Sequence, residues 1–290
     1  MKPLLEKLLA AGPVVTDGAW GTQLQAQGLG VGEFPDLWNL TNPAKVEAVA
    51  RAYVEAGSQV ILTNTFGANR VRLAETGRAA DVPAINRAGV EISRRAARGT
   101  AHVFASLGPS GKMILTGEVT ADELRAAFAE QAQALAQAGA EAIVVETMCD
   151  LEEARLAVAA AAETGLPVVA CMVFDSGRDK DRTMMGNTPE QAAEVLSAAG
   201  ADVLGANCGQ GIAGFPLLCR RFRAATDRPL WFKPNAGLPQ WVEGRATYTT
   251  TPEEFVQSVP ALVQGGANFI GGCCGSNPDF IRAIIRCLRG

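Results

Sequence analysis

Eight short apolar runs alternate with eight longer helical patterns along this chain of 290 residues, and this alternation restricts the possible folds more than any other feature. Each run is nearly continuous in apolar residues, as expected of parallel strands that are buried on both faces. The runs span 14–17, 59–63, 102–107, 142–147, 168–173, 203–207, 230–234 and 269–273. The helical segments span 43–56, 84–98, 121–138, 151–164, 189–199, 215–225, 252–265 and 278–288.

The number of units favours a closed barrel. Eight strand–helix units in 290 residues match the count and size of a (β/α)₈ fold. A doubly wound open sheet is the alternative, but it usually carries G-x-G-x-x-G after its first strand, whereas residues 17–22 read Asp-Gly-Ala-Trp-Gly-Thr. No linker or low-complexity stretch interrupts the alternation. We therefore predict an α/β protein with one domain, 1–290, that folds as a single (β/α)₈ TIM-type barrel with its active site at the C-terminal ends of the strands.

Charge and hydropathy exclude several classes of protein. The net charge of −4, with 19% charged residues, gives no electrostatic footprint for nucleic acid. No apolar run approaches the roughly 20 residues of a membrane span, and the first nine residues mix acid and base unlike a signal peptide. Seven irregularly spaced cysteines suit a reducing compartment. These features predict a soluble cytoplasmic protein.

Polar side chains follow many of the predicted strands at the point where each strand ends. In a barrel these ends lie on one face, so the side chains are expected to form a joint site. An ordinary apolar core would not place acids, amides and thiols at the same end of so many strands. The residues are Asp17, Thr63, Asn64, Thr65, Glu146, Thr147, Asn207, Cys208, Asn235, Cys273 and Cys274.

Three of the seven cysteines are positioned to share a metal ion. Cys208 ends the sixth strand, and Cys273 and Cys274 end the eighth. Neighbouring strands lie roughly 4.8 Å apart, so the ends of these two strands are on the order of 10 Å from each other. Zn–S bonds of roughly 2.3 Å reach across that gap, and three cysteinates leave one tetrahedral position open, as in catalytic zinc sites. The alternatives are buried thiols or a Cys273–Cys274 disulfide. Buried thiols are the expected role of the other cysteines, Cys149, Cys171, Cys219 and Cys287.

The motifs at the strand ends resemble those of the homocysteine S-methyltransferase family. The resemblance runs from about residue 4 to the end of the chain and is most specific in the double-cysteine motif combined with a distant Asn-Cys. It implies a (β/α)₈ barrel, Zn²⁺ on Cys208, Cys273 and Cys274, and homocysteine as the methyl acceptor. The motifs are those at 17–22, 63–66, 146–147, 207–209, 234–237 and 271–275.

The resemblance also implies roles for residues around the metal. Asp17 and Glu146 match acids that hold the substrate ammonium group, and the backbone near Gly18 and Ala19 matches the region that receives its carboxylate. In the methionine-synthase branch of the family, the residue at the position of Asn235 can occupy the fourth zinc position before substrate arrives. The expected reaction forms methionine by methyl transfer to the homocysteine thiolate.

The methyl donor is less constrained by the sequence. Trp38, in the segment 23–39 after the first strand, offers an indole face that could attract an onium donor such as a betaine or a sulfonium compound, or it could pack a lid. Trp20 and Trp241 are further aromatic candidates. The motifs at 63–68 and 234–237 are closer to the methionine-synthase branch, in which a separate corrinoid protein would supply the methyl group.

Two other classes of function compete with the methyltransferase interpretation. One is a non-catalytic module that binds a thiol or a metal. The other is an aldolase- or lyase-type barrel in which Lys180 or Lys233 forms an imine, although no phosphate-binding loop accompanies either lysine. The single histidine, His102, starts the third strand and is expected to be structural.

Overall fold

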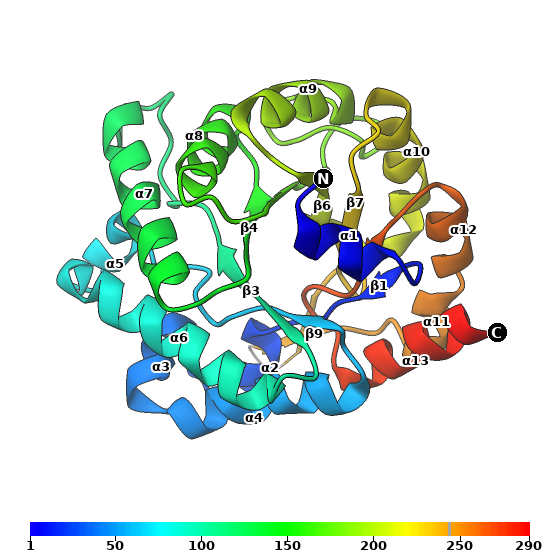
Figure 1. Cartoon of the computed structure of the whole chain (residues 1–290), viewed down its shortest axis with the longest axis horizontal. Coiled ribbons are helices and arrows are strands. Elements are labelled where there is room, and N and C mark those ends of the chain that lie inside the picture. The colour runs from blue at the N-terminus through cyan, green and yellow to red at the C-terminus, as the bar shows by residue number, and fades with distance from the viewer. Residues whose placement is uncertain (243–244) are drawn as a thin grey trace.

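The computed structural model describes residues 1–242 and 245–290 and contains a parallel eight-stranded sheet in the order β1-β10-β7-β6-β5-β4-β3-β2. Successive strands along the chain are neighbours in this sheet, which curls into a nearly closed barrel surrounded by helices (Figure 1). The predicted (β/α)₈ fold is confirmed. The strands are β1 Val14–Val15, β2 Val60–Ile61, β3 His102–Leu107, β4 Ala142–Met148, β5 Val168–Met172, β6 Val203–Cys208, β7 Leu230–Pro234 and β10 Phe269–Ile270.

The barrel closes between β1 and β2 through hydrogen bonds made just outside the two strands. The backbone N–H of Gln59 donates to the carbonyl of Val15 at 2.8 Å, and the side chain of Gln59 accepts from the N–H of Val15 at 2.9 Å. Further along, the carboxylate of Asp17 accepts from the N–H of Leu62 at 2.7 Å. The side chains of Gln59 and Asp17 therefore replace part of the missing ladder.

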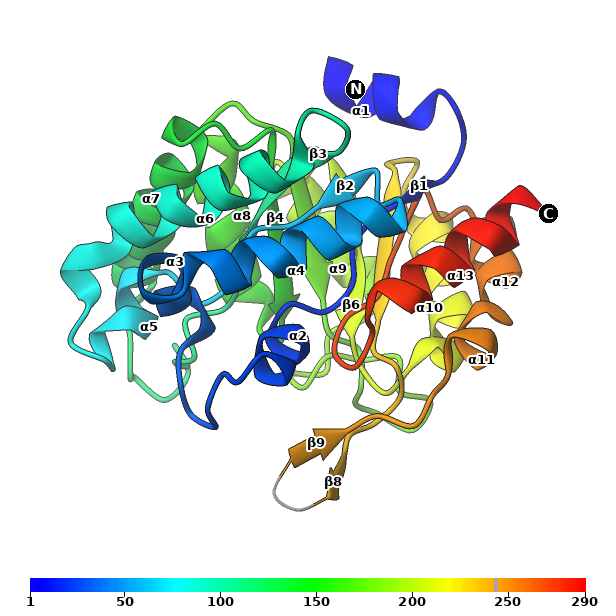
Figure 2. The ribbon, with the colours of Figure 1, turned by 90° about the horizontal axis from the view of Figure 1, so that it is seen from below.

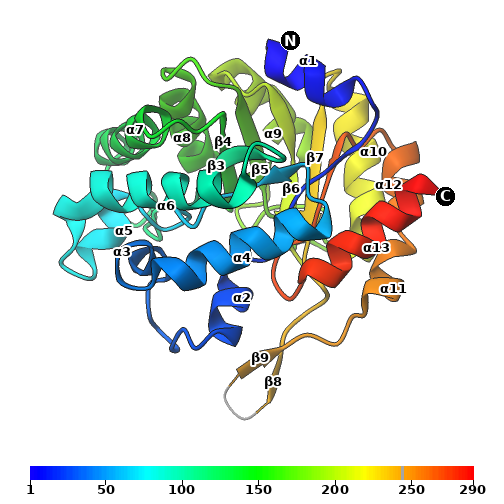
Figure 3. The same cartoon turned by 60° about the horizontal axis from the view of Figure 1, so that its bottom comes forward.

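An outer layer of helices covers the strands, and Figure 3 shows α6, α4 and α13 side by side in this layer. The predicted helix 252–265 is in fact two helices, because Pro260 follows a break at Gln257–Ser258 and cannot donate a backbone hydrogen bond. The other predicted helices are confirmed to within a few residues. The layer consists of α4 Pro43–Ala56, α6 Val82–Ala97, α7 Ala121–Gln137, α8 Leu151–Ala162, α9 Pro189–Ala199, α10 Phe215–Ala225, α11 Pro252–Val256, α12 Val259–Gln264 and α13 Pro278–Arg289.

The first helix, α1 Pro3–Leu9, closes one end of the barrel. Its Leu5 and Leu8 belong to the same apolar cluster as the inward-facing side chains of the strands. At the centre of that cluster the ring of Trp231 stacks on Phe104 at 6.1 Å and contacts Phe269 at 5.1 Å, measured between ring centroids. These side chains fill the inside of the barrel on the side of α1.

The remaining elements gather at the opposite end from α1, where a two-stranded hairpin, β8 Gln240–Val242 and β9 Arg245–Thr247, projects from the barrel (Figure 2). The segment after β1 folds into α2 Gly21–Ala26, a 3₁₀ turn at Pro35–Leu37 and α3 Trp38–Thr41, and the segment after β2 contains α5 Arg70–Ala74. None of the described helices has the length and hydropathy needed to cross a bilayer.

Candidate functional site

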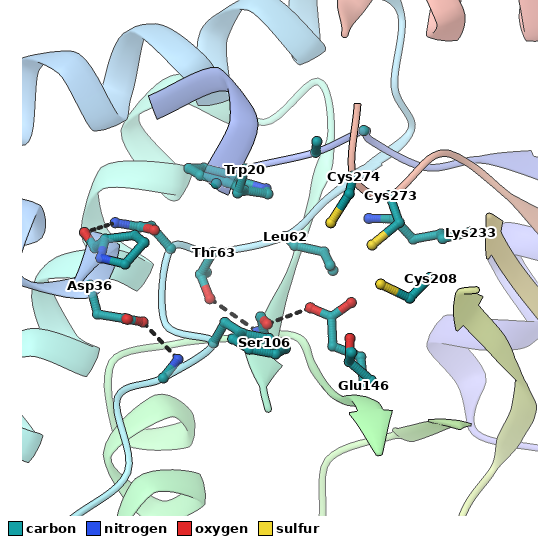
Figure 4. Close-up of a pocket in the computed structure, with 18 of the residues that line it drawn as sticks. Trp20, Asp36, Leu62, Thr63, Ser106, Glu146, Cys208, Lys233, Cys273 and Cys274 are labelled. Atoms are coloured by element: carbon teal, nitrogen blue, oxygen red, sulfur yellow. Dashed lines mark hydrogen bonds between the residues drawn. The ribbon is translucent and has the colours of Figure 1, made fainter. Parts of the chain in front are cut away.

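A cavity of about 410 Å³ opens at the carboxyl ends of the strands, within the range of small-molecule sites. Figure 4 shows the sulfur atoms of Cys208, Cys273 and Cys274 grouped at one end of this cavity and Asp36 at the other. Trp20 lies along one wall, and Glu146 lies near the sulfurs. The cavity thus has a sulfur end and a distal end with different chemistry.

The three predicted cysteine ligands meet at the sulfur end, where their Sγ atoms all lie within 4.8 Å of one another. Cys208 ends β6 with a positive φ of 65°, a conformation that L-residues rarely adopt. Strand β10 stops at Ile270, so Cys273 and Cys274 follow an irregular segment, and the backbone N–H of Cys273 donates to the carbonyl of Pro234 at 2.8 Å. The break in the strand allows two consecutive side chains to face one centre.

The three sulfurs influence one another strongly. Hydrogen bonds from the thiols of Cys208 and Cys273 lower the pKa of Cys274 to about 3. The same hydrogen bonds, together with burial, raise the pKa of Cys208. The hydrogen bond with Cys208 lowers the pKa of Cys273, but the hydrogen bond with Cys274, burial and the charge of Cys274 outweigh it and raise that pKa to about 12. The three thiols therefore oppose one another's ionisation, and a bound cation would favour the thiolate form of all three.

The residues around the cluster fit a zinc ion. Three thiolates are the ligands that Zn²⁺ accepts in catalytic sites with one open position. The amide of Asn235 donates through Nδ2 to the carbonyl of Gly209 at 2.7 Å, while its Oδ1 is buried and has no hydrogen-bond partner among the described residues. A buried amide oxygen without a partner is costly in a protein, and a cation at the neighbouring cysteines would satisfy it. Asn235 is placed beside the cluster by its backbone N–H, which donates to the carbonyl of Cys208 at 3.0 Å.

Asn207 ties this cluster to β4 and was not assigned a role from the sequence. Its Oδ1 accepts from the N–H of Thr147 at 2.7 Å, and its Nδ2 donates to Thr147 Oγ1 at 2.7 Å and to Cys273 Sγ at 3.8 Å. Thr147 also has a positive φ, of 62°. Two unusual backbone conformations, at Thr147 and Cys208, are therefore joined by one amide side chain beside the cysteines.

Asp17 is buried, and both oxygens of its carboxylate accept hydrogen bonds from other groups of the protein. One oxygen forms a buried ion pair with Lys233, and the other accepts from Trp20 Nε1 at 2.8 Å and from the N–H of Leu62 at 2.7 Å. Asp17 is not among the described residues that line the cavity, whereas its partner Lys233 is. A lysine in an apolar strand gave no sequence signal for this pairing.

Lys233 does not have the properties of an imine-forming amine. Burial alone would lower the pKa of Lys233, but the nearby carboxylates of Asp17 and Glu146 outweigh this effect and raise it. A protonated amine that is held in an ion pair is not nucleophilic. His102 is likewise structural: its Nδ1 lies 2.7 Å from Glu141 Oε1 at the start of β3.

Glu146, at the end of β4, is the carboxylate that faces the cavity near the sulfurs (Figure 4). Its Oε1 accepts from the hydroxyl of Ser106, which the sequence did not single out. Burial raises the pKa of Glu146 to about 7, although Lys233 and the Ser106 hydrogen bond act in the opposite direction. An incoming ammonium group would favour the ionised carboxylate.

Gly18 and Ala19 line the cavity, and hydrogen bonds from other residues fix their backbone. The N–H of Ala19 donates to Ser276 Oγ at 3.1 Å, and the hydroxyl of Tyr53 donates to the carbonyl of Ala19 at 2.6 Å. A Cβ atom at Gly18 would lie 2.7 Å from the Tyr53 hydroxyl and 2.8 Å from Ser276 Oγ. Glycine is therefore needed for this close approach.

Trp38 is not brought into the cavity. It is buried in the outer apolar core and lines a separate hollow, where its ring carries the ammonium of Lys45 at 4.8 Å from the centroid. The described aromatic side chains that line the main cavity are Trp20, Phe34 and Phe66. Trp241 lies on β8 with 72% of its surface exposed and is not part of the described wall of the cavity.

Comparison with known sequences agrees with the cysteine motifs. The family model described as homocysteine S-methyltransferase matches residues 14–288. The methionine synthase of Mycobacterium leprae (strain TN) is 31% identical over 99% of this chain and 25% of its own length. The methionine synthase of Mycobacterium tuberculosis (strain ATCC 25618 / H37Rv) is 31% identical over 93% of this chain and 24% of its own length. The chain spans about a quarter of these relatives.

Comparison with solved structures supports the fold. The metallated form of the homocysteine methyltransferase MmuM from Escherichia coli superposes with a TM-score of 0.81 at 24% identity, covering 99% of both chains. The oxidised form of the same enzyme superposes with a TM-score of 0.81 at 22% identity, covering 97% of this chain and 99% of that chain. The family match covers nearly the whole barrel, including all three cysteines of the cluster, and the chain therefore belongs to the homocysteine S-methyltransferase family.

Proposed function

We propose that this chain methylates the sulfur of homocysteine, held by zinc at Cys208, Cys273 and Cys274, with a small onium compound as the methyl donor. The observation that carries the proposal is the convergence of three sulfurs from β6 and the segment after β10 within 4.8 Å, at the end of a cavity. When bound, zinc would take the homocysteine thiol as a further ligand and favour its deprotonation. The seven free cysteines fit the reducing cytoplasm, where the cluster stays available to a metal.

The residues around the cluster supply what an amino-acid thiol needs. Glu146 is the cavity carboxylate that would pair with the substrate ammonium group, and the backbone at Gly18 and Ala19 would receive the substrate carboxylate. Asp17 contributes indirectly by holding Lys233 at the cavity wall. Asn235, with its unpartnered Oδ1, would complete the ligand set until homocysteine displaces it.

The proposed transfer is a direct displacement. A lone pair of the homocysteine sulfur forms the S–CH₃ bond while the C–N or C–S bond of the onium donor breaks, and the bonding pair leaves with the neutral amine or sulfide. The leaving group is neutral, so no general acid is required. The charge on the donor is lost in the step, and the thiolate charge is lost with it. A site that holds both charges close together in a partly dry cavity favours this reaction.

A methylcorrinoid carried by a separate protein is the alternative donor. It is favoured by the similarity to methionine synthases, of which this chain covers only about a quarter. The small cavity could not enclose a corrinoid, so such a donor would have to present its methyl group from the mouth. The onium donor is preferred because aromatic side chains and the Asp36 carboxylate line the cavity itself.

The test compares metal content with turnover in matched variants. The purified chain should hold about one zinc per molecule and form methionine from homocysteine when offered glycine betaine or S-methylmethionine. Cys273→Ser should lose both the metal and the activity. Cys287→Ser should keep both, because Cys287 lies on α13, where its Sγ is 3.8 Å from the carbonyl oxygen of Val256, and it is not part of the cluster. Full activity of metal-free protein would refute the zinc assignment, and turnover with methylcobalamin alone would select the corrinoid alternative.

A further inference from the structure

The end of β4 departs from a regular strand at residues that line the cavity. The register between β4 and β5 shifts between Val145 and Met148, and Glu146 and Thr147 lie within this shift. Thr147 has a φ of 62°, which is unusual for a β-branched residue and persists only where the surrounding structure holds it. Both residues of the shift line the cavity. Whatever holds Thr147 therefore also determines where the neighbouring carboxylate of Glu146 lies.

Asn207, which is fully buried, supplies this restraint from β6. Its Oδ1 accepts from the backbone N–H of Thr147, and its Nδ2 donates to Thr147 Oγ1, both at 2.7 Å. Strand β5 lies between β4 and β6, but its pairing with β6 ends at Met172 and Ala206, one residue before Asn207. The amide therefore joins two strands that are not neighbours, beyond the end of the strand between them.

The same amide also contacts the cysteine cluster. Its Nδ2 donates to Cys273 Sγ at 3.8 Å, and the next residue along β6 is Cys208, with a φ of 65°. A primary amide has two N–H donors and one carbonyl oxygen, and the contacts with Thr147 and Cys273 engage both donors and the oxygen. Side chains that hydrogen-bond to metal ligands fix the orientation of those ligands. Asn207 thus connects the cluster to the end of the strand that carries Glu146.

The hydrogen bond from Ser106 to Glu146 does not involve the cluster. The hydroxyl of Ser106 donates to Oε1 from β3, and Figure 4 shows the carboxylate between Ser106 and the sulfur atoms. This bond orients the carboxylate relative to β3, whereas the cysteines follow β6 and β10. Asn207 is a described side chain that hydrogen-bonds both to the residue after Glu146 and to a cysteine of the cluster.

We propose that Asn207 is a positioning residue that sets the separation between the Glu146 carboxylate and the cysteine cluster, and that this separation selects homocysteine over cysteine. The inference rests on the proposed function and adds a specificity-determining residue to it. An amino-acid thiol that binds at both places needs a chain of the right length between its ammonium group and its sulfur. Cysteine is one methylene shorter. In a site of fixed separation it can satisfy only one of the two contacts, whereas a site that relaxes would let it satisfy both.

The experiment compares homocysteine with cysteine in two variants that break the connection differently. Calorimetry on zinc-saturated protein measures the Kd of each amino acid, and the wild type should favour homocysteine about ten- to 200-fold, the usual range for one methylene. Asn207→Ser removes all three contacts and should reduce this preference about tenfold, mainly by weakening homocysteine binding. Thr147→Val removes only the hydroxyl acceptor and should reduce the preference by a smaller factor.

Metal binding separates the two variants. Asn207→Ser loses the contact with Cys273 and should weaken zinc binding about ten- to a hundredfold, as is usual for residues that support metal ligands. Thr147→Val keeps that contact and should bind zinc like the wild type. Cobalt-loaded samples of all the proteins should show thiolate-to-metal charge-transfer absorption, which reports that the cysteines remain ligands.

The matched control is Asn86→Ser on α6. Asn86 is also fully buried and, like Asn207, donates two hydrogen bonds and accepts one, but it lies outside the described wall of the cavity. The control variant should lose stability while it keeps both the preference for homocysteine and the zinc affinity. A change of preference in Asn207→Ser alone therefore cannot come from a general loosening of the fold.

The outcomes distinguish this inference from the function it rests on. A preference that is unchanged in Thr147→Val, or unchanged in metal-loaded Asn207→Ser, would overturn it, and so would an equal loss in Asn86→Ser. Thr147→Val decides if Asn207→Ser does not fold or does not hold the metal. A wild type that binds cysteine as tightly as homocysteine would also overturn the inference, while homocysteine methylation stands. If the zinc-loaded wild type neither binds homocysteine nor methylates it with any donor, the proposed function itself fails.

Discussion

The ammonium group of Lys233 and the carboxylate of Asp17 form a buried ion pair beneath the cysteine cluster, joining the end of β7 to the end of β1. Lys233 is 2% exposed and Asp17 is not exposed at all. Asp17 also accepts from Leu62 and Trp20, so a single carboxylate connects β1, β7 and β2 with the segment that leads into α2. The ion pair therefore helps to hold β1 against its neighbours in the barrel, and it also fixes Lys233 at the cavity.

Removing Lys233 should cost more stability than removing the whole pair. Lys233→Met leaves the Asp17 carboxylate buried without its cation, which we expect to lower the free energy of unfolding by about 3–5 kcal/mol. The double variant Lys233→Met/Asp17→Asn removes both charges and should recover much of this loss. Urea denaturation of the two variants measures the difference. A single variant within about 1 kcal/mol of the wild type would show that the pair contributes little.

Replacing Glu146 should change stability and activity in opposite directions. Because the pKa of Glu146 is about 7 in the folded protein and 4.5 ordinarily, the folded state binds more protons between these pH values. Ionisation of Glu146 therefore costs folding free energy that is absent below about pH 4.5 and complete above about pH 7. In metal-free protein, Glu146→Gln should be more stable than the wild type at pH 8, on the order of 2–3 kcal/mol, and equally stable at pH 4.

The same substitution should weaken homocysteine binding at pH 8, because Gln cannot balance an ammonium charge. Calorimetry on zinc-loaded protein measures this loss, which we expect to be tenfold or more. Lowering the pH through 7 should weaken binding to the wild type and have little effect on the variant. A pH dependence that is the same in both proteins would assign the titration to another group.

Removal of the metal should expose one set of thiols and no other. In zinc-loaded protein Cys208, Cys273 and Cys274 are expected to be protected from a thiol reagent such as dithionitrobenzoate, and chelation should release all three. Cys274 should react first, because hydrogen bonds from its neighbours lower its pKa to about 3. The buried thiols of Cys171 and Cys219 serve as the internal reference. Unchanged reactivity after chelation would contradict a shared metal.

Gly205, in β6, should not tolerate a side chain. A Cβ atom there would lie 1.8 Å from the carbonyl oxygen of Trp231 on the neighbouring β7, so the two strands would have to separate. We expect Gly205→Ala to destabilise the protein by about 3 kcal/mol, at the upper end for overpacking, and to weaken metal binding by displacing Cys208. Gly21→Ala is the control, since nothing lies within 4 Å of its Cβ position. Thermal unfolding and zinc titration compare the two variants.

The sequence predicted the barrel well because its strands and helices follow local rules. Pro43, Pro189 and Pro278 each occupy the first turn of a helix that the structure confirms, and the double cysteine lies where β10 has already ended. The hairpin β8–β9 was not predicted, because its strands are three residues each and carry no long apolar run. Short elements of this kind depend on contacts that the local pattern does not encode.

The site was predicted less completely than the fold. The convergence of the cysteines follows from strand order, whereas the direction of a side chain on a loop does not. Trp38 turns into the core beneath Lys45, and Asp17 turns to Lys233, because each finds a partner that is distant in sequence. Asn207 received no role and Ser106 was not singled out, because an amide or a hydroxyl near the end of a strand is common. Only the contacts with Cys273 and Glu146 make them distinctive.

Because α1 packs against one end of the barrel, we expect both proposed reactants to enter and leave at the opposite end, where the cavity opens. In the proposed reaction the acceptor would bind innermost, at the sulfurs, whereas the other end of the cavity is bordered by the partly exposed Arg72 and Phe66. Homocysteine should therefore load first, and methionine should remain trapped until the spent donor departs. Initial-rate kinetics would then show a compulsory order, with methionine competing against homocysteine and the demethylated donor being the first product released. Random-order binding of the two substrates would instead require a second route to the cavity between the strands.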